Sequence, residues 1–123
     1  MGTWAIKLDL IRDWLDEQDS ETAACIKMAL EVLKDRGPAL GRPLVDTVSY
    51  SKYGNMKELR PASPGESEIR ILFAFDPARR AVMLLAGDKA KGTSRLKWSR
   101  WYRKAVPEAE RLFARHLEEG EDR

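Results

Sequence analysis

Three basic side chains stand at or beside strand-like positions of this 123-residue chain. Arg60 ends the segment "NMKELR", Arg70 is the second residue of "IRILFAF", and Lys89 ends "AGDK". A charge that faces the interior from a strand costs several kcal/mol unless it is paired. These residues therefore require either acidic partners or an open face that holds an anionic ligand.

Strand periodicity indicates which face these charges occupy. Because successive side chains of a strand alternate between its two faces, Arg70 lies opposite the apolar run that begins with Ile69. By the same period Arg60 shares a face with Glu58, and Lys57 alternates out of phase with both. The carboxylate of Glu58 or of Glu68 could form an ion pair with Arg70. A purely structural ion pair therefore stays open beside a functional role.

The segment 88–104, "DKAKGTSRLKWSRWYRK", concentrates cations and aromatic rings. Lys and Arg neutralise phosphates and aromatic rings stack on unpaired bases, which is what a groove for single-stranded RNA requires. The residues of this segment that are predicted to contact RNA are Lys91, Arg95, Lys97 and Trp98, and Lys57 from the earlier strand is predicted to join them. The alternative is structural, since Trp98 and Trp101 at helical spacing also fit core positions and the arginines fit a solvated helix face.

Other chemistries have little support in the sequence. No Cys or His cluster has zinc spacing, no Gly-rich phosphate loop is present, and His116 is the single histidine. His116 lies on an apolar helical stripe, which favours a structural role. We expect neither a metal nor a cofactor.

The net charge of +2 conceals a segregation of charge along the chain. Residues 1–36 carry a net −3, residues 37–106 a net +8 and residues 107–123 a net −3. A positive middle segment is a candidate surface for a polyanion, because phosphate neutralisation with counterion release drives sequence-independent nucleic-acid binding.

Size and composition predict one globular domain. The length suits a single core over residues 1–118, with 119–123 as an acidic, frayed tail. No apolar run approaches the length of a membrane span, and the N-terminal residues lack the features of a secretory signal. With one cysteine, which cannot form an internal disulfide, we expect a cytoplasmic protein with no membrane contact.

Periodicity predicts the elements that position the basic residues. Residues 3–8 alternate as a first strand, and a short helix follows over about 9–16. A second helix starts at Asp19 or Ser20 and ends at Arg36, because Gly and Pro follow it. These two helices are expected to form a hairpin.

The rest of the chain predicts a meander and a last helix. The strand segments are 45–53, 56–60, 69–75 and 80–87. From Trp98 an apolar stripe stays in phase across Pro107, which predicts one kinked helix. The expected class is α+β: a small antiparallel sheet, an N-terminal helical hairpin and a C-terminal helix, with the helices mainly on one face and the other face open.

Four segments, taken in order, resemble the RelE/ParE superfamily of toxins from type II toxin–antitoxin systems, and within it the phage-related, HigB-like branch. They are "RGPALGRPLVDTV", "NMKELR", "IRILFAFDPARRAVMLLAGDK" and "WYRKAVPEAERLFARHL", within residues 25–118. The resemblance implies a RelE-like fold and an endoribonuclease that cleaves messenger RNA, often on the ribosome. It also implies a cognate antitoxin, for which we expect a helix-turn-helix protein.

The resemblance also implies roles for four residues. Arg60, Arg70 and Lys89 match basic active-site positions of the RNA-cleaving members, and Tyr102 in "WYRK" matches the terminal aromatic residue. The two guanidiniums would clamp the phosphate, Lys89 would act as a general acid, and Tyr102 would carry a proton or stack on a base. Ala86 departs from the branch, in which a second Gly is common at that position.

Two other functions stay open at this point. A toxin of the same fold could block a target such as DNA gyrase by binding alone. A module that has lost its activity could retain the fold as an interaction surface.

Overall fold

The computed structural model describes residues 4–65, 67–88 and 96–121, with the backbone alone for 96–99 and 121. In chain order the elements are β1 Ala5–Lys7, η1 Asp9–Ile11, α1 Arg12–Asp16, α2 Ser20–Arg36, η2 Gly37–Ala39, β2 Val45–Thr47, β3 Met56–Leu59, β4 Ile69–Phe75, β5 Arg80–Asp88 and α3 Leu96–Glu121. The expected α+β class, with helices before the meander and a helix after it, is confirmed.

The five strands form one sheet in the order β1-β5-β4-β3-β2. The meander from β2 to β5 is antiparallel, as predicted. β1, however, joins β5 in parallel, with Ala5 opposite Arg80, so the sheet is mixed. The helices α1 and α2 carry the chain from β1 at one edge of the sheet to β2 at the other edge, and the meander then leads back to β5 beside β1. Parallel strands need such a long connection.

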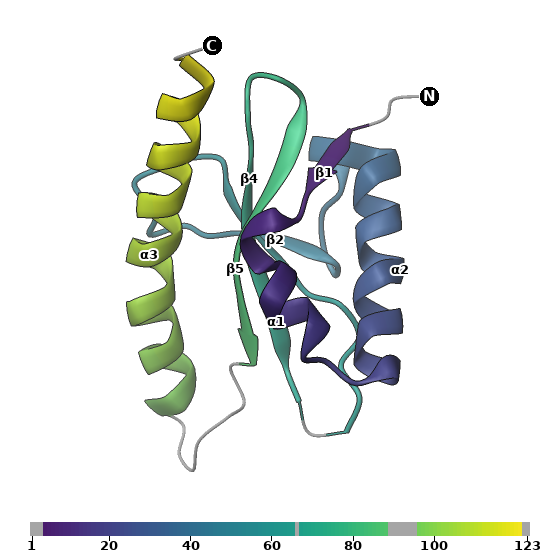
Figure 1. Cartoon of the computed structure of the whole chain (residues 1–123). Helices are drawn as coiled ribbons and strands as arrows, with labels where there is room; N and C mark the ends of the chain where they lie inside the picture. Colours follow the sequence, from purple (N-terminus) through teal and green to yellow (C-terminus); the bar gives the residue numbers. More distant parts are fainter. Residues whose placement is uncertain (1–3, 66, 89–95, 122–123) are drawn as a thin grey trace.

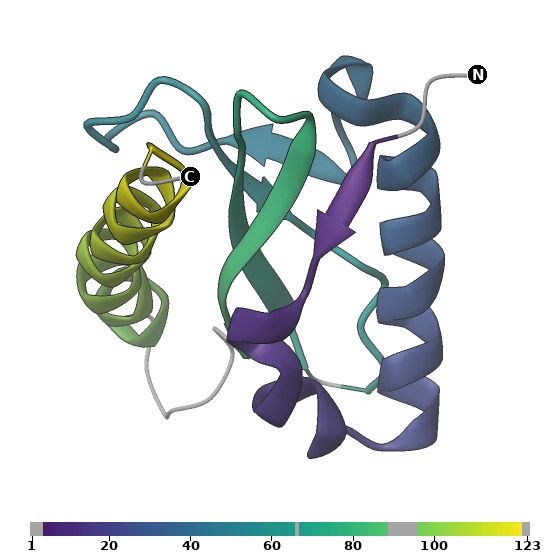
Figure 2. The same cartoon turned by 45° about the horizontal axis from the view of Figure 1, so that its top comes forward.

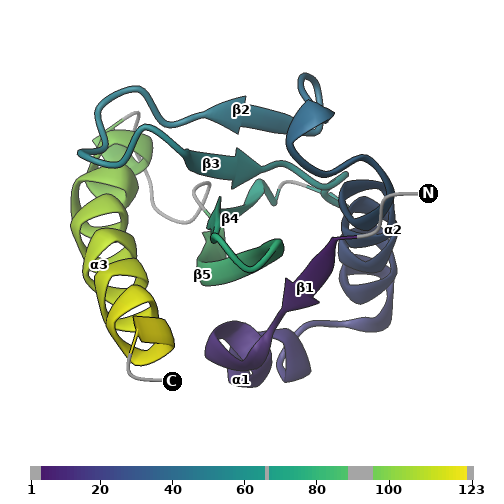
Figure 3. The same ribbon diagram turned by 90° about the horizontal axis from the view of Figure 1, so that it is seen from above.

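The sheet lies between two helical layers, with α3 on one side and α2 on the other (Figures 1 and 3). The core therefore has two halves. Ile26 and Leu33 of α2 pack on Ile71 and Phe73 of β4, and all four are fully buried. Asp19 caps α2 by accepting a hydrogen bond from the Thr22 amide at 2.7 Å, as the sequence predicted.

The expectation of an open second face is wrong. α3 covers that face: Ala109 and Phe113 pack on Leu72 and Val82 in the second half of the core. The helix runs unbroken through Pro107, and it continues to Glu121 where the sequence predicted a frayed tail from residue 119. The physical reason is that Leu72, Ala74 and Val82 make this sheet face as apolar as the first, so it must also be buried.

The strand expected over 45–53 stops at Thr47. The chain then turns, because a carboxylate of α3 satisfies its polar groups: Glu110 Oε2 accepts from Ser51 Oγ at 2.9 Å and from the Lys52 amide. Ser and Gly favour such turns over a ladder. This segment, residues 48–55, is held against α3 and presents Tyr50 to solvent.

A β-bulge in β5 sets the register beside the basic residues. Leu72 lies opposite Leu85, whereas Phe73 lies opposite Met83, so β5 has one extra residue at this point. Beyond the bulge Arg70 therefore faces Gly87, and the two share one face of the sheet. Within residues 4–65, 67–88 and 96–121, no helix has the length and apolarity that crossing a membrane demands.

Gly37 is the position where the backbone most strictly requires glycine. Its φ of 56° and ψ of −140° strain any residue with a Cβ, and a Cβ there would meet the indole of Trp4. We expect Gly37→Ala to lower the free energy of unfolding by about 2 to 3 kcal/mol in chemical denaturation. Gly41→Ala is the control, because a Cβ at Gly41 meets nothing within 4 Å. Equal stability of the two variants would contradict this account.

Candidate functional site

Arg60 and Arg70 meet at one end of the sheet, on the face that α3 covers. Leu59 of β3 lies opposite Ile71 of β4, which places the residues that flank this pair beside each other on adjacent strands. This is the end at which β5 stops and α3 begins, low in Figure 1. The predicted alternation of faces is confirmed, because Ile71 belongs to the α2 half of the core and Leu72 to the α3 half.

The carboxylate of Glu58 lies at the centre of this cluster. Its Oε1 is 2.9 Å from Arg60 Nε and 3.8 Å from Arg70 Nε, and its side chain is only 5% exposed. The hydroxyl of Tyr102 also interacts with this carboxylate. One buried acid therefore holds two guanidiniums and a phenol from three elements, which fixes their positions relative to one another.

Asp46 and Glu68 are two further acidic residues that pair with these arginines. Asp46 Oδ2 lies 3.2 Å from Arg60 Nη2, and Glu68 Oε1 lies 3.9 Å from Arg70 Nη2. Arg70 also donates from Nη1 to the Ile69 carbonyl at 2.7 Å. The sequence left open a structural ion pair of Arg70 with Glu58 or Glu68, and Arg70 forms both pairs.

The network is incompletely satisfied. Among the described residues, Glu58 Oε2 and Arg70 Nε are buried without a hydrogen-bond partner. Arg60 is 33% exposed and Arg70 13%, so the cluster reaches solvent mainly through Arg60. Buried polar atoms without partners are costly, so these two atoms require an explanation such as a catalytic role or a bound water or ion.

Tyr102 projects from the first part of α3 into this cluster. Burial raises the pKa of its phenol well above the ordinary value of 10.0, and the neighbouring Glu58 carboxylate raises it further. The phenol therefore stays protonated at neutral pH and can donate a proton. Its ring lies edge-on to Trp101 at 5.0 Å, and a Cβ at Gly87 would meet the Trp101 indole, so Trp101 depends on a glycine beside Arg70.

Tyr50 is a component that the sequence analysis missed. It is 61% exposed, and its ring lies 6.3 Å from that of Tyr102. The sequence pattern predicts a strand over residues 45–53, and because Tyr is common in strands, its residue type carries no functional signal there. A turn assignment from the neighbouring Ser and Gly would have placed it in an exposed loop.

The structure separates Lys57 from the cluster. Lys57 lies opposite Thr47 and Phe73, on the α2 side of the sheet, and donates to Thr47 Oγ1 at 3.0 Å. The predicted phase difference between Lys57 and Arg60 is therefore confirmed. Its role in RNA binding stays a prediction, and the geometry gives it no support.

The remaining predicted residues cannot be placed in this geometry. Lys89, Lys91 and Arg95 lie outside the described residues, as do the side chains of Lys97 and Trp98. Their roles stay predictions from the sequence. Among the described residues no group of three His, Cys, Asp or Glu side chains is arranged to hold a metal ion.

The α+β fold with its five-stranded mixed sheet is consistent with a small RelE-like domain. A family model described as phage-derived protein Gp49-like matches residues 13–114, and the chain belongs to this family. The predicted resemblance to the phage-related, HigB-like branch is thereby confirmed.

Two relatives from Mycobacterium tuberculosis are similar over most of this chain. The protein named "Putative toxin HigB2" is 51% identical over 119 residues, which cover 97% of this chain and 57% of that protein. The protein named "Putative toxin HigB3" is 46% identical over 105 residues, which cover 85% of each chain. The chain thus spans little more than half the length of the first relative. No solved structure matches it.

Proposed function

We propose that this chain is the toxin of a type II toxin–antitoxin system and cleaves messenger RNA on the ribosome without a metal ion. The observation that carries the proposal is the convergence of Arg60, Arg70 and Tyr102 around the buried Glu58. The names of the two relatives support the toxin assignment. Such a toxin would act in the cytoplasm and be neutralised by a cognate antitoxin, for which we expect a helix-turn-helix protein.

The proposed reaction is attack of a ribose 2′-hydroxyl on the adjacent phosphate. Negative charge grows on the phosphorane, and two guanidiniums stabilise it because each matches two phosphate oxygens and remains charged. The 2′-hydroxyl would lose its proton to solvent as its bond to phosphorus forms, and Lys89 would donate a proton to the departing 5′-oxygen, with Tyr102, which stays protonated, as a proton carrier beside it. Glu58 acts through the others as a positioning residue, and Lys89 keeps the general-acid role that the sequence predicts.

The same geometry also favours the alternative of a protein without nuclease activity. Glu58, Asp46 and Glu68 neutralise the two arginines, and α3 covers their face. A toxin that blocks a target by binding, or an inactive module, would be compatible with such a closed network. RNA cleavage requires that substrate phosphates replace part of this pairing.

Tyr50 is the exposed ring next to this network, and we expect it to stack on an unpaired base. Tyr50→Ala should weaken binding of a single-stranded RNA oligonucleotide by about tenfold, because base stacking contributes about 1 to 3 kcal/mol. Tyr50→Phe keeps the ring and should bind like the wild type. Fluorescence anisotropy measures both affinities. Equal affinity of the Ala variant and the wild type would exclude the stacking role.

Primer extension on total RNA after brief induced expression tests the proposed function. New 5′ ends inside translated messages, absent with Arg70→Ala, would support a ribosome-linked nuclease. Arg111→Ala is the matched control, because Arg111 is exposed on α3 and pairs only with Glu108 among the described residues. Growth arrest with intact messages would favour a target-blocking toxin. Normal growth with intact messages would favour an inactive module.

A further inference from the structure

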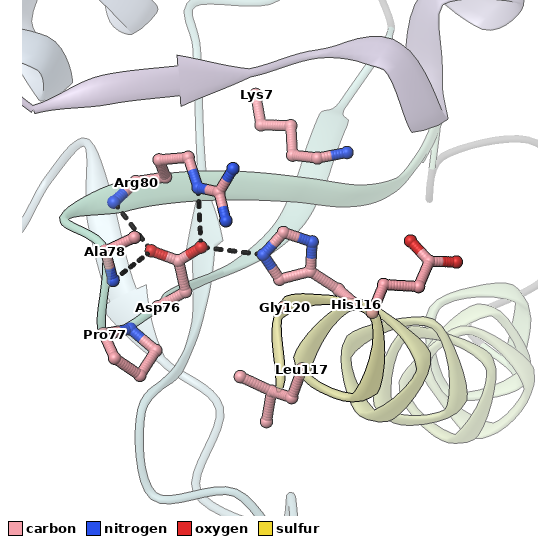
Figure 4. A pocket seen from close by; sticks show the side chains of 9 residues that line it. Lys7, Asp76, Pro77, Ala78, Arg80, His116, Leu117 and Gly120 are labelled. Atoms are coloured by element: carbon pink, nitrogen blue, oxygen red, sulfur yellow. Dashed lines mark hydrogen bonds and ion pairs between the residues drawn. The ribbon is translucent and has the colours of Figure 1, made fainter. Parts of the chain in front are cut away.

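A cavity lies at the opposite end of the molecule from the arginine cluster. It has a volume of about 510 Å³ and lies between the end of β1, the β4–β5 turn and the last turns of α3 (Figure 4). Figures 1 and 2 show the C-terminal end of α3 beside this turn. Arg70 is the second residue of β4 and Asp76 follows the last one, so at 3.3 Å per residue the two sites are about 20 Å apart.

Asp76 forms the buried base of this cavity. Its side chain is 2% exposed; Oδ1 accepts from the amides of Ala78 and Arg80, and Oδ2 accepts from Arg80 Nε at 2.8 Å. His116 Nε2 lies 2.7 Å from the same Oδ2. Burial by itself raises the pKa of Asp76, but the hydrogen bonds from His116 and Arg80 outweigh it and lower the pKa below 3.8.

This carboxylate determines how His116 presents its ring. An ionised carboxylate only accepts hydrogen bonds, so the proton of the neutral imidazole is on Nε2. Nδ1 is then available to a ligand, and in Figure 4 it is turned toward the side on which Lys7 and Arg80 lie. His116 is 7% exposed, so the structural role expected from the sequence and a contact to the cavity coexist.

Two cations join His116 at this cavity. Within the described part of the chain, the terminal nitrogens of Arg80 make no hydrogen bond, since only Nε contacts Asp76. Lys7 contributes an ammonium that pairs with the exposed Asp9 at 2.8 Å. Glu119 is an acidic residue at the rim of the cavity, where it is exposed near the end of α3. Arg80 balances the buried charge of Asp76 through Nε alone, so its terminal nitrogens remain as donors for a ligand in the cavity.

We propose that this cavity binds a small ligand through a phosphate monoester group. Arg80 and Lys7 supply donors for the phosphate oxygens, and His116 Nδ1, which carries no proton, accepts a hydrogen bond from the hydroxyl of the monoanionic phosphate, a group that a carboxylate lacks. Pro77 and Leu117 line the cavity beside them and offer an apolar wall for the rest of the ligand. The volume lies within the range of small-molecule sites. This site is independent of the proposed RNA cleavage.

The single histidine makes the test specific, because every imidazole signal in a nuclear magnetic resonance spectrum arises from His116. The probes are inorganic phosphate, adenosine monophosphate and acetate, titrated into the full chain at constant ionic strength and pH. We expect a saturable shift with phosphate or the nucleotide and none with acetate. Saturation by the nucleotide alone would show that the apolar wall contributes, and saturation by both that the phosphate group suffices.

Variants connect the shift to the cavity. Lys7→Gln alters a partly exposed residue at the edge strand and should raise the half-saturating concentration by about tenfold, as should Arg80→Gln. Arg111→Gln, on the exposed side of α3, should leave it unchanged. The proposal is overturned if neither phosphate probe saturates, if acetate binds equally well, or if Lys7→Gln binds like the wild type.

Discussion

Replacing Arg70 with alanine should lower cleavage of ribosome-bound messenger RNA by about 10²- to 10³-fold. Arg70 carries one of the two guanidiniums proposed to stabilise the phosphorane, and removing one such donor has effects of this size in other enzymes. Arg70→Lys keeps the charge but loses the planar pair of donors, so it should restore only part of the rate. The wild type, Arg70→Ala and Arg70→Lys are compared by their initial rates of messenger RNA cleavage on purified ribosomes.

Arg60 carries the second guanidinium, and combining its substitution with that of Arg70 extends this experiment. Because Glu58 holds both arginines, we expect Arg60→Ala and Arg70→Ala together to cost less than the product of their separate effects. Thermal unfolding of each variant controls for stability, since the buried Glu58 loses an ionic partner. A folded Arg70→Ala protein with the wild-type rate would refute the assignment of this residue.

Replacing Asp76 with alanine should lower the free energy of unfolding by about 3 to 5 kcal/mol. Asp76 accepts hydrogen bonds from two backbone amides, Arg80 and His116, and its loss leaves four donors, the buried His116 among them, without this partner. It also removes the link between the β4–β5 turn and α3. Asp35→Ala, at an exposed position of α2, is the matched control and should change stability little. Denaturation in urea at neutral pH measures the difference, and equal midpoints would contradict this role.

The stabilisation of the folded protein by Asp76 should decrease as the pH falls. In the folded protein the pKa of Asp76 lies below its ordinary value of 3.8, so as the pH falls the unfolded chain binds the proton first. The stabilisation by Asp76 is therefore complete above that value and declines as the pH falls through the lower pKa of the folded state. The difference between wild type and Asp76→Ala should shrink in acid. A constant difference from neutral pH down to the acid transition would show that the hydrogen bonds do not depend on ionisation.

The sequence by itself determined the elements and the faces of the central strands. The Asp19 cap and the Gly-Pro that follows Arg36 located α2, because these are local backbone effects. Strand alternation predicted that Arg70 lies opposite the Ile71 face, because a period of two is a property of any strand. The family resemblance follows from the same ordered segments.

The tertiary structure decided what surrounds those residues. Periodicity shows that a strand has two faces but not which element covers each, so the closure of the Arg70 face by α3 was not predictable. The turn that exposes Tyr50 depends on Glu110, and the contact between His116 and Asp76 joins positions 40 residues apart. Such long-range contacts form only when the chain packs, because one local pattern fits several partners and the burial of both sheet faces selects among them.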